Sequence, residues 1–424
     1  MDRRSFIART GLAAAGVGVA ACGPKAAPRV APSSPAAAST GAPASTRAMV
    51  DLVPVRASWD RVIRTTIGLR PHRPSGFVLR ADRLDDKTLI HNYGHGGSGM
   101  SLSWGTARLA ADIASEGGIR PAAVVGSGVV GLTTGRQLQR HGFDVTIYAM
   151  AIPPDTTSNM SLAGFTPTSG LVEGPRRTPA WDEQFRKAVD IAYRQLQLLS
   201  GSPLHGVSWV NNYTLTDDEK MASGTNTMLP AHVQTGVRLL QPGEHPFHTK
   251  YAIEQPEMRF EPSIYLDALM RDFLMFGGRI VIRKFDTPRD LMSLTQPLIV
   301  NCTGLGAKAI FGDEELIPLK GQLTVLVPQP EVTYGTNGGS RVPPPPGSFG
   351  IHMMPRSDGI ILGGTSERGV STFDVNESEF RRVVSGHIEV FSAMRASQAA
   401  SPRTARVDAP RVPPTADAFF DLQS

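Results

Sequence analysis

A glycine-rich turn near residue 126 carries the clearest chemical signal in the sequence. An apolar run, residues 122–125, leads directly into Gly126-Ser127-Gly128-Val129-Val130-Gly131, and a helical pattern continues to His141, with Gly142 as its expected end. Glycines in this GxGxxG arrangement let backbone amides approach a pyrophosphate, whose charge then meets the positive end of the helix. A second strand-like run follows at 144–148, as a dinucleotide-binding unit requires. The turn therefore predicts dinucleotide binding, against the alternative of a purely structural turn.

This turn alone leaves the choice between nicotinamide and flavin nucleotides open. In a plain NAD site, an acid after the second strand binds a ribose hydroxyl. The corresponding stretch here is Tyr148-Ala149-Met150-Ala151, and the nearest acid is Asp155. The sequence after the second strand therefore disfavours NAD.

A second glycine-rich loop, HNYGHGGSG at residues 91–99, is the other informative feature. A helical pattern to Gly117-Gly118 follows it, so the loop forms another potential nest of backbone donors. His91 and His95 are four residues apart, but the glycines around them make a helical metal pair implausible. A hydrolase nucleophile turn is also disfavoured, because Met100 stands where the G-x-S-x-G pattern needs glycine.

The composition of the chain is that of an ordinary globular protein, whose helices and strands would position these loops. The 424 residues are 41% hydrophobic and 19% charged, which excludes a wholly disordered or fibrous chain. The formal charge of +5 comes without a basic cluster, so we expect no nucleic-acid partner. Two cysteines, Cys22 and Cys302, exclude a disulfide framework and a cysteine-rich zinc site, and we expect no metal.

Hydrophobic periodicity gives the order of the remaining elements. It predicts helices at 58–67, 102–116, 181–199, 265–276 and 377–394, and strands at 77–79, 88–90, 279–284, 297–303, 322–327 and 359–362. The turn-rich stretch 203–261 is consistent with antiparallel strands.

The first residues are typical of an export signal and not of part of a folded domain. Arg3-Arg4 precedes an apolar run at 11–21 that is too short for a membrane span, which needs about 20 residues. The pair resembles a twin-arginine signal, with Asp2 in place of the usual Ser or Thr, and residues 19–22 resemble a lipobox ending at Cys22. A chance apolar N-terminus is the alternative. Residues 23–48, rich in Ala, Pro and Ser, predict a flexible tether, and 396–424 a disordered tail.

Several motifs together resemble the D-amino-acid oxidase family. These are HNYGHGGSG followed by Trp104-Gly105, GLRPHRP at 68–74, the fingerprint at 124–132, Thr156-Thr157-Ser158, and IVNCTG at 299–304. The resemblance covers about residues 55–395. In the family the HNYGHGG loop ends the chain and the fingerprint begins it, whereas here the loop comes first. The sequence therefore resembles a circular permutant, whose ends near Trp59 and Met394 should lie close together.

The resemblance implies bound FAD and oxidation of an amine next to a carboxylate by hydride transfer to the flavin, with no protein acid or base strictly needed. Arg70 would pair with the substrate carboxylate, and Gly97 would offer its carbonyl to the substrate amine. The implied flavin-nucleotide contacts are Gly126, Gly128, Val129, Val130, Gly131, Thr156, Thr157, Ser158, Gly164, Phe285, Thr303, Gly96, Gly99, Met100 and Ser101. Phe285 and Thr303 would line the adenosine end.

The sequence departs from the family pattern at the active site. The two expected tyrosines are replaced by Ser348 and His352, and Ser98 replaces an aromatic residue in the glycine loop. His352 either lines the active site or is an ordinary polar residue. These changes suggest a substrate other than a standard D-amino acid.

We therefore expect an α/β fold in which a Rossmann-type FAD-binding domain is interleaved with an α+β substrate domain built on an antiparallel sheet, circularly permuted. The FAD-binding domain would comprise 77–170 and 256–312, and the substrate domain 49–76, 171–255 and 313–395. The expected function is oxidation of an amino acid or related amine by an exported, extracytoplasmic protein that is anchored through a lipid on Cys22. Oxygen or a quinone would be the electron acceptor. The alternatives are a flavin dehydrogenase that uses a quinone or carrier, and a catalytically silent flavin-binding lipoprotein.

Overall fold

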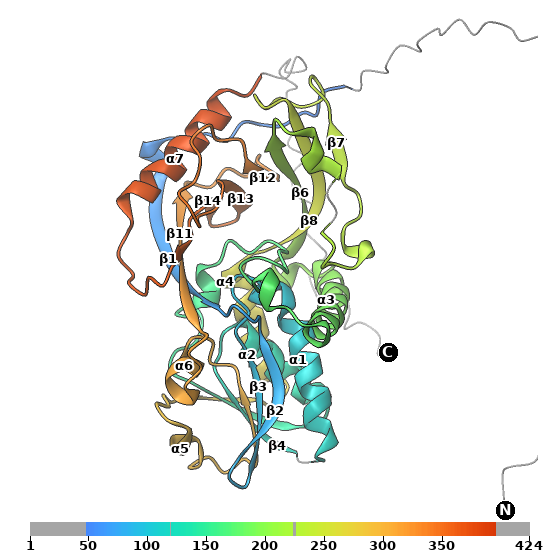
Figure 1. The fold of residues 1–424 in the computed structure, drawn as a ribbon, viewed down its shortest axis with the longest axis vertical. Coiled ribbons are helices and arrows are strands. Elements are labelled where there is room, and N and C mark those ends of the chain that lie inside the picture. The colour runs from blue at the N-terminus through green and yellow to red at the C-terminus, as the bar shows by residue number, and fades with distance from the viewer. Residues whose placement is uncertain (1–47, 119, 224–225, 396–424) are drawn as a thin grey trace, which may run out of the picture. The chain divides into compact units, whose positions relative to one another are not determined.

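The computed structural model describes residues 48–118, 120–223 and 226–395, so the predicted signal, tether and tail lie almost entirely outside the described residues. Within the described part, the strands form one sheet of six and one of nine (Figure 1). No described helix is long and apolar enough to cross a membrane.

The six-stranded sheet contains the glycine turn at its carboxyl edge. Its order is β2 (Val78–Leu84), β3 (Lys87–Tyr93), β10 (Leu298–Asn301), β4 (Pro121–Val125), β5 (Asp144–Ala149) and β9 (Arg279–Ile282). The strands from β3 to β9 pair in parallel, and β2 is antiparallel to β3. The parallel strands are short and β10 is fully buried, as expected for a sheet covered on both faces.

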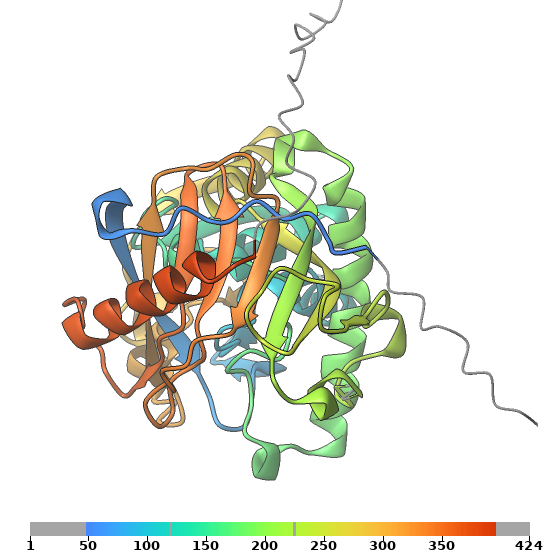
Figure 2. The same ribbon diagram turned by 90° about the horizontal axis from the view of Figure 1, so that it is seen from above.

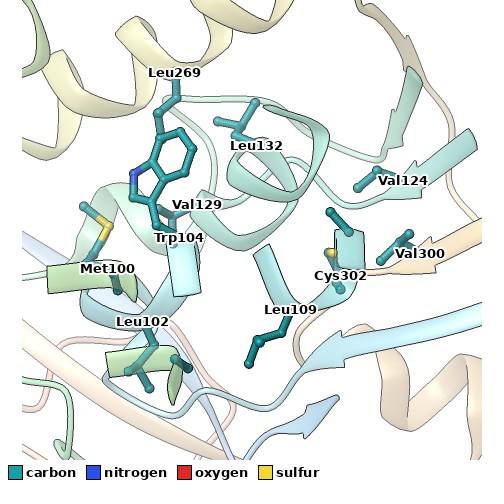
Figure 3. Packing of buried hydrophobic residues seen from close by; sticks show 14 of the residues in the cluster. Met100, Leu102, Trp104, Leu109, Val124, Val129, Leu132, Leu269, Val300 and Cys302 are labelled. Carbon is teal, nitrogen blue, oxygen red and sulfur yellow. The ribbon is translucent and has the colours of Figure 1, made fainter. Parts of the chain in front are cut away.

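Three helices cover one face of this sheet: α1 (Gly99–Glu116), α2 (Val129–Arg140) and α4 (Pro262–Met275). Helix α3 (Pro179–Ser200) packs on α1, and the opposite face of the sheet packs against Phe285, Leu291 and Ile310. Figure 3 shows Trp104 and Leu109 of α1, Leu132 of α2 and Leu269 of α4 in the shared core. The Nε1 of Trp104 donates to the hydroxyl of Tyr265 at 2.8 Å, which satisfies both buried polar atoms.

The nine-stranded sheet carries most of the second half of the chain. Its order is β1 (Val62–His72), β11 (Ile317–Leu326), β14 (Gly359–Gly363), β13 (His352–Arg356), β12 (Tyr334–Gly338), β6 (Val207–Thr216), β8 (Tyr251–Phe260) and β7 (Arg238–Leu240), with β15 (Glu367–Arg368) beside β11. All pairs are antiparallel except β12 with β6.

One face of this sheet is covered by α7 (Glu377–Ser392), which lies across β11 and its neighbours in Figure 2. Val384 and Phe391 of α7 pack there on Tyr213, Met353 and Leu362. The opposite face is therefore the one left for a binding site.

Short elements complete the described chain. They are α5 (Pro288–Leu291), α6 (Gly306–Phe311) and the 3₁₀ helices η1 (Trp59–Arg61), η2 (Thr157–Met160), η3 (Gly174–Arg176), η4 (Pro203–His205), η5 (Glu219–Ser223) and η6 (Ala231–Val233).

The predicted α/β fold with a Rossmann-type sheet and an antiparallel sheet is confirmed. The helix predicted at 58–67 is wrong: only Trp59–Arg61 is helical, and β1 follows. Val62, Ile63, Thr65, Thr66 and Ile67 are β-branched, so they favour a strand once β11 is available as a partner. The short strands β12 and β13 were not predicted. The nine-stranded sheet also continues to Phe260, beyond the expected domain boundary at residue 255.

Candidate active site

The glycines of the first turn have different structural roles. A Cβ on Gly126, whose φ is +111°, would overlap the carbonyl oxygen of Cys302, and one on Gly131 would overlap that of Gly126. Gly128 is more open, since among the described residues other than its chain neighbours only Ser158 Oγ lies within 4 Å of its Cβ position, at 3.2 Å. Two glycines thus allow close packing of strand and helix, and the third leaves space for a ligand.

Two helices begin side by side at this turn. The N-cap residues, Gly128 of α2 and Ser98 of α1, provide no side-chain cap. The Cβ position of Gly99 lies 3.7 Å from Val129 Cγ1, so the loop at 96–101 faces the turn at 126–131. Neither helix has an acidic residue in its first turn. The paired N-termini suit an anionic ligand.

The segment after β5 runs along these helix starts. The hydroxyl of Ser158 accepts a hydrogen bond from the Val129 amide at 3.0 Å, and Thr156 Oγ1 donates to Asn159 Oδ1 at 2.8 Å, with Thr157 beginning η2. Further on, Ala163 has a left-handed φ of 68°, which costs free energy for a residue with a Cβ. Its neighbour Gly164 bridges to Arg259 of β8.

Hydrogen bonds tie the loop at 96–101 to β1 and to the segment after β5. The amide of Gly96 donates to the carbonyl of Pro71 at 2.9 Å, and Ser101 Oγ accepts from the amide of Thr166 at 2.8 Å. Met100 and Ser101 are both buried.

The residues expected at the adenosine end follow two strands of the six-stranded sheet. Thr303 comes after β10, and its Oγ1 donates to Asn301 Oδ1 at 2.7 Å. Phe285 comes after β9 and packs edge-on against Tyr148, with ring centroids 6.1 Å apart. Val130 is half-buried on α2. Such a carboxyl edge of parallel strands is where nucleotides bind in open α/β sheets.

The uncovered face of the nine-stranded sheet carries a row of polar side chains opposite glycines. Strand register places Arg70, His352 and Asn212 on this one face. A Cβ on Gly321 would overlap the Arg70 guanidinium, and one on Gly363 would overlap the ring of His352. A Cβ on Gly335 would lie 3.1 Å from Asn212 Oδ1. The glycines give each polar side chain room to lie along the sheet.

In the described part of the chain, Arg70 is a cation without an anionic partner. Among the described residues its guanidinium makes only a long hydrogen bond, 3.4 Å, to the carbonyl of Thr365, and lies 5.8 Å from the ring centre of Phe349. Burial lowers its pKa to about 10, so it remains charged at neutral pH. The Cβ position of Gly97 is 3.3 Å from Arg70 Cδ, and the Gly97 amide donates to the carbonyl of Ser169 at 3.0 Å.

His352 lies on the same face but stays neutral. Burial lowers its pKa to about 3, and the charges of His387 and Arg70 add to this effect. The hydroxyl of Ser348 already has two partners within the protein. It donates a hydrogen bond to Glu379 Oε2 at 3.0 Å and accepts one from the amide of Ser366 at 3.1 Å. Arg70 is thus left as the cation for an anionic ligand, with Gly97 beside its side chain and His352 on the same sheet face.

Comparison with known proteins identifies the family to which this arrangement belongs. The family model described as FAD dependent oxidoreductase, DAO, matches residues 16–113 and 122–417. The chain belongs to this family of FAD-dependent oxidoreductases.

Two curated relatives are similar over most of their length. A D-amino acid oxidase of Dugesia ryukyuensis is 24% identical over 275 residues, which are 62% of this chain and 75% of the relative. A human D-aspartate oxidase is 25% identical over 269 residues, 62% of this chain and 73% of the relative. The solved glycine oxidase of Geobacillus kaustophilus has a TM-score of 0.48 and 17% identity, covering 65% of this chain and 80% of that one.

The residues of this FAD-dependent oxidoreductase fit its cofactor. The open side of Gly128 and the two helix starts, whose N-cap residues provide no side-chain cap, would hold the pyrophosphate and the electron-rich edge of the flavin ring. When bound, FAD would supply the acceptor for one hydride, which carries two electrons.

Two further polar residues on the same sheet face, Asn212 and Glu257, were not predicted from the sequence. They are joined by a hydrogen bond of 2.6 Å from Asn212 Nδ2 to Glu257 Oε2. The stretches WVNNYT and EQPEMR carry polar residues on both faces of their strands, so no local pattern singles out this pair.

Proposed function

We propose that this protein oxidises an amino acid, or a related compound with an amine next to a carboxylate, by transferring a hydride from the carbon that bears the amine to FAD. The observation that carries the proposal is Arg70, a partly buried guanidinium with no carboxylate partner among the described residues. A planar guanidinium binds both oxygens of a carboxylate, and leaving it buried without an anion is costly. The substrate carboxylate would be that anion.

The neighbours of Arg70 support this assignment. Gly97 lies against the Arg70 side chain, so its carbonyl is available to a substrate amine beside the bound carboxylate. The uncapped start of α1 follows two residues later. The protein would therefore fix the donor carbon relative to the flavin, and orientation of this kind can supply much of the rate acceleration.

The relatives support the same substrate class. Their names are D-amino acid oxidase and D-aspartate oxidase, and both name amino acids as substrates. Because Ser348 and His352 replace the two tyrosines and Ser348 is already hydrogen-bonded, carboxylate binding would depend on Arg70. We therefore expect a substrate preference that differs from that of a standard D-amino-acid oxidase.

An anaerobic substrate screen tests this function. The purified holoprotein is mixed without air with D- and L-amino acids, glycine and N-methylated amino acids, and bleaching of the flavin absorbance is followed. Reduction by at least one amino acid supports the proposal, and reduction by none supports a silent flavin-binding protein. Admitting oxygen or adding a quinone afterwards identifies the electron acceptor.

Export and lipid anchoring form a second part of the proposal, supported by the Arg3-Arg4 pair and the lipobox-like residues 19–22. The mature protein would begin at a lipid-modified Cys22 outside the cytoplasm. Intact-mass measurement of the membrane fraction tests this, with Cys22→Ser as the variant that should lose the lipid. Replacing both arginines by lysine should block export. A product that keeps Met1 and carries no lipid would contradict the assignment.

Circular permutation of the family fold is the third part. The two ends of the described chain approach the same residue: Tyr334 Oη donates to the carbonyl of Val53 at 2.9 Å and lies 3.8 Å from Met394 Sδ. The rings of Trp59 and Phe380 of α7 are 5.7 Å apart. Ends this close support an ancestral connection between them, with the present link between α1 and β4 as the newer one. The division into an FAD-binding and a substrate domain is part of this proposal.

A further inference from the structure

A small cavity beside β8 has no part in the proposed function. It lies where α3 and the segment after β5 pack against the paired strands β6 and β8, and its volume is about 70 Å³. None of Arg70, Gly97 and His352 lines it. A water molecule needs about 10–15 Å³ of such space, so the cavity has room for about five non-hydrogen atoms. It could therefore hold a small ligand away from the Arg70 site.

Three aromatic rings line this cavity, those of Phe165, Tyr193 and Trp209. The ring centroids of Phe165 and Tyr193 are 5.4 Å apart, and those of Tyr193 and Trp209 are 6.3 Å apart with the ring planes at 86°. Tyr193 is 8% exposed and Trp209 is 45% exposed, so one ring belongs to the interior and the other to the mouth of the cavity. The faces of such rings carry partial negative charge and attract cations.

One acid lines the same cavity. The half-buried side chain of Glu257 accepts a hydrogen bond of 2.6 Å at Oε2 from Asn212 Nδ2, which fixes the carboxylate. Within the described ranges no donor reaches Oε1, and Glu257 forms no ion pair. A carboxylate that is partly removed from water is normally paired with a cation or fully hydrogen-bonded. The cavity therefore combines aromatic walls with an uncompensated negative charge.

The neighbouring charged groups already have partners. Arg259, also on β8, is paired with Glu261 at 3.4 Å. His232, whose ring contacts that of Tyr193, is paired with Asp190 at 2.9 Å. Burial raises the pKa of Glu257 to about 7, against the lowering effect of its hydrogen bond. A cation in the cavity would favour the ionised carboxylate.

We propose that this cavity is a second ligand site, which binds a small methylated ammonium group between the rings of Tyr193 and Trp209 with Glu257 as the counter-ion. A primary ammonium needs three acceptors, whereas Glu257 has one oxygen without a hydrogen bond. A methylated nitrogen needs few or no acceptors, and its methyl groups bring the positive charge into contact with ring faces. The site goes beyond the proposed function and does not depend on it, because binding here involves no electron transfer.

Calorimetric titration of the holoprotein with tetramethylammonium chloride tests the site. The measurement is made near pH 8.5, where Glu257 is ionised, and sodium chloride keeps the ionic strength constant. tert-Butanol, a neutral molecule of similar size, is the reference ligand. Wild type should bind tetramethylammonium about tenfold more tightly than tert-butanol, because only the cation gains from the carboxylate and the ring faces.

Glu257→Gln tests the counter-ion, because it keeps the shape of the side chain and removes its charge. Tetramethylammonium affinity should fall about tenfold, whereas tert-butanol affinity should not change. Glu183→Gln, at an exposed acid on α3, is the matched control and should bind both ligands as wild type does.

Trp209→Leu tests the aromatic wall. Tetramethylammonium affinity should fall about fivefold, and Trp209→Phe, which restores a ring, should recover most of it. Trp59→Leu is the matched control, since Trp59 is 47% exposed and lies outside the cavity.

Equal affinities of wild type for tetramethylammonium and tert-butanol would overturn the proposal, and so would unchanged tetramethylammonium affinity in Glu257→Gln. If Glu257→Gln does not fold, equal affinities in Trp209→Leu and Trp59→Leu have the same meaning. Phosphatidylcholine vesicles carry the same group: retention of the holoprotein that tetramethylammonium reverses would identify a lipid headgroup as the ligand, and no retention a free amine. Failure of the proposed function is separate, since it is a lack of flavin reduction by any amino acid.

Discussion

The guanidinium of Arg70 occupies the space above Gly321, where a Cβ would overlap it. The two residues lie on adjacent strands, since β1 pairs with β11 and Gly68 stands opposite Gly321. The absence of a side chain at Gly321 therefore sets the height of Arg70 above the sheet. The following substitution uses this relationship.

Gly321→Ala should displace the guanidinium without unfolding the protein, because the group that must move is the end of a flexible side chain. We expect FAD content to be unchanged and the affinity for benzoate, a carboxylate whose binding is read from the shift of the flavin absorbance, to fall about tenfold, which corresponds to about 1.4 kcal/mol. Gly174→Ala is the control, because no described residue other than its chain neighbours has an atom within 4 Å of the new Cβ. Equal benzoate affinity in both variants would show that Arg70 is not the carboxylate ligand.

Arg70→Leu should keep the flavin but lose activity on carboxylate substrates. Removing one partner of a buried charge-assisted pair costs about 2–5 kcal/mol, so kcat/KM should fall about 30-fold or more. Arg70→Lys keeps the charge but loses the planar fork, and should be intermediate. The measurement is anaerobic flavin reduction, and unchanged kinetics in Arg70→Leu would place the carboxylate site elsewhere.

Gly128→Val should give a folded protein that is purified without FAD. The new side chain would fill the open space at the start of α2, where the pyrophosphate would lie. Absorbance at 450 nm relative to 280 nm measures the FAD content. Gly174→Val serves as the control for valine at a glycine, and yellow Gly128→Val protein would argue against this nucleotide position.

Acid should destabilise the fold partly through His95. This buried ring stacks on Phe77, with centroids 5.4 Å apart, and Nε2 lies 3.0 Å from Thr106 Oγ1. Burial lowers its pKa to about 3, below the ordinary value of 6.5, so the fold favours the neutral ring. The contribution of the neutral His95 ring to the free energy of unfolding is complete above pH 6.5 and is lost as pH falls toward 3.

His95→Gln should therefore lose less stability on acidification than wild type. Acidification from pH 7 to 4.5 should lower the free energy of unfolding of wild type by about 2 kcal/mol more than that of His95→Gln, as measured by urea denaturation at saturating FAD. His232→Gln, at an exposed histidine, is the control. Parallel pH profiles of His95→Gln and wild type would contradict the expectation.

A chain restored to the family order should fold and bind FAD. It would begin at Arg120, continue to Met394, join by a short linker to Val50, and end at Gly117. Because Val53 and Met394 both contact Tyr334, the linker needs to span only a few residues. Yellow protein with the thermal stability of the mature chain is the expected result. Aggregation with linkers of every length tried would contradict the permutation.

The sequence by itself determined the nucleotide-binding half of this protein. The strand, glycine turn and helix from Pro121 to Arg140 are local, because backbone conformation there depends on residues that are neighbours in the chain. The same holds for the loop at 96–101, whose glycines adopt or permit unusual conformations. Arg70 was predicted as the carboxylate ligand because it lies in the contiguous motif GLRPHRP.

Only the tertiary structure decided the remaining features. The first residues of Val62–His72 suit either a helix or a strand, and pairing with β11 made the segment a strand. Glu257 and Asn212 are 45 positions apart and are part of no local motif. Their proximity depends on the register of β6 with β8, and the unusual pKa of Glu257 depends on burial by the whole sheet. Local sequence can set backbone conformation, whereas burial and partner choice arise from contacts between distant residues.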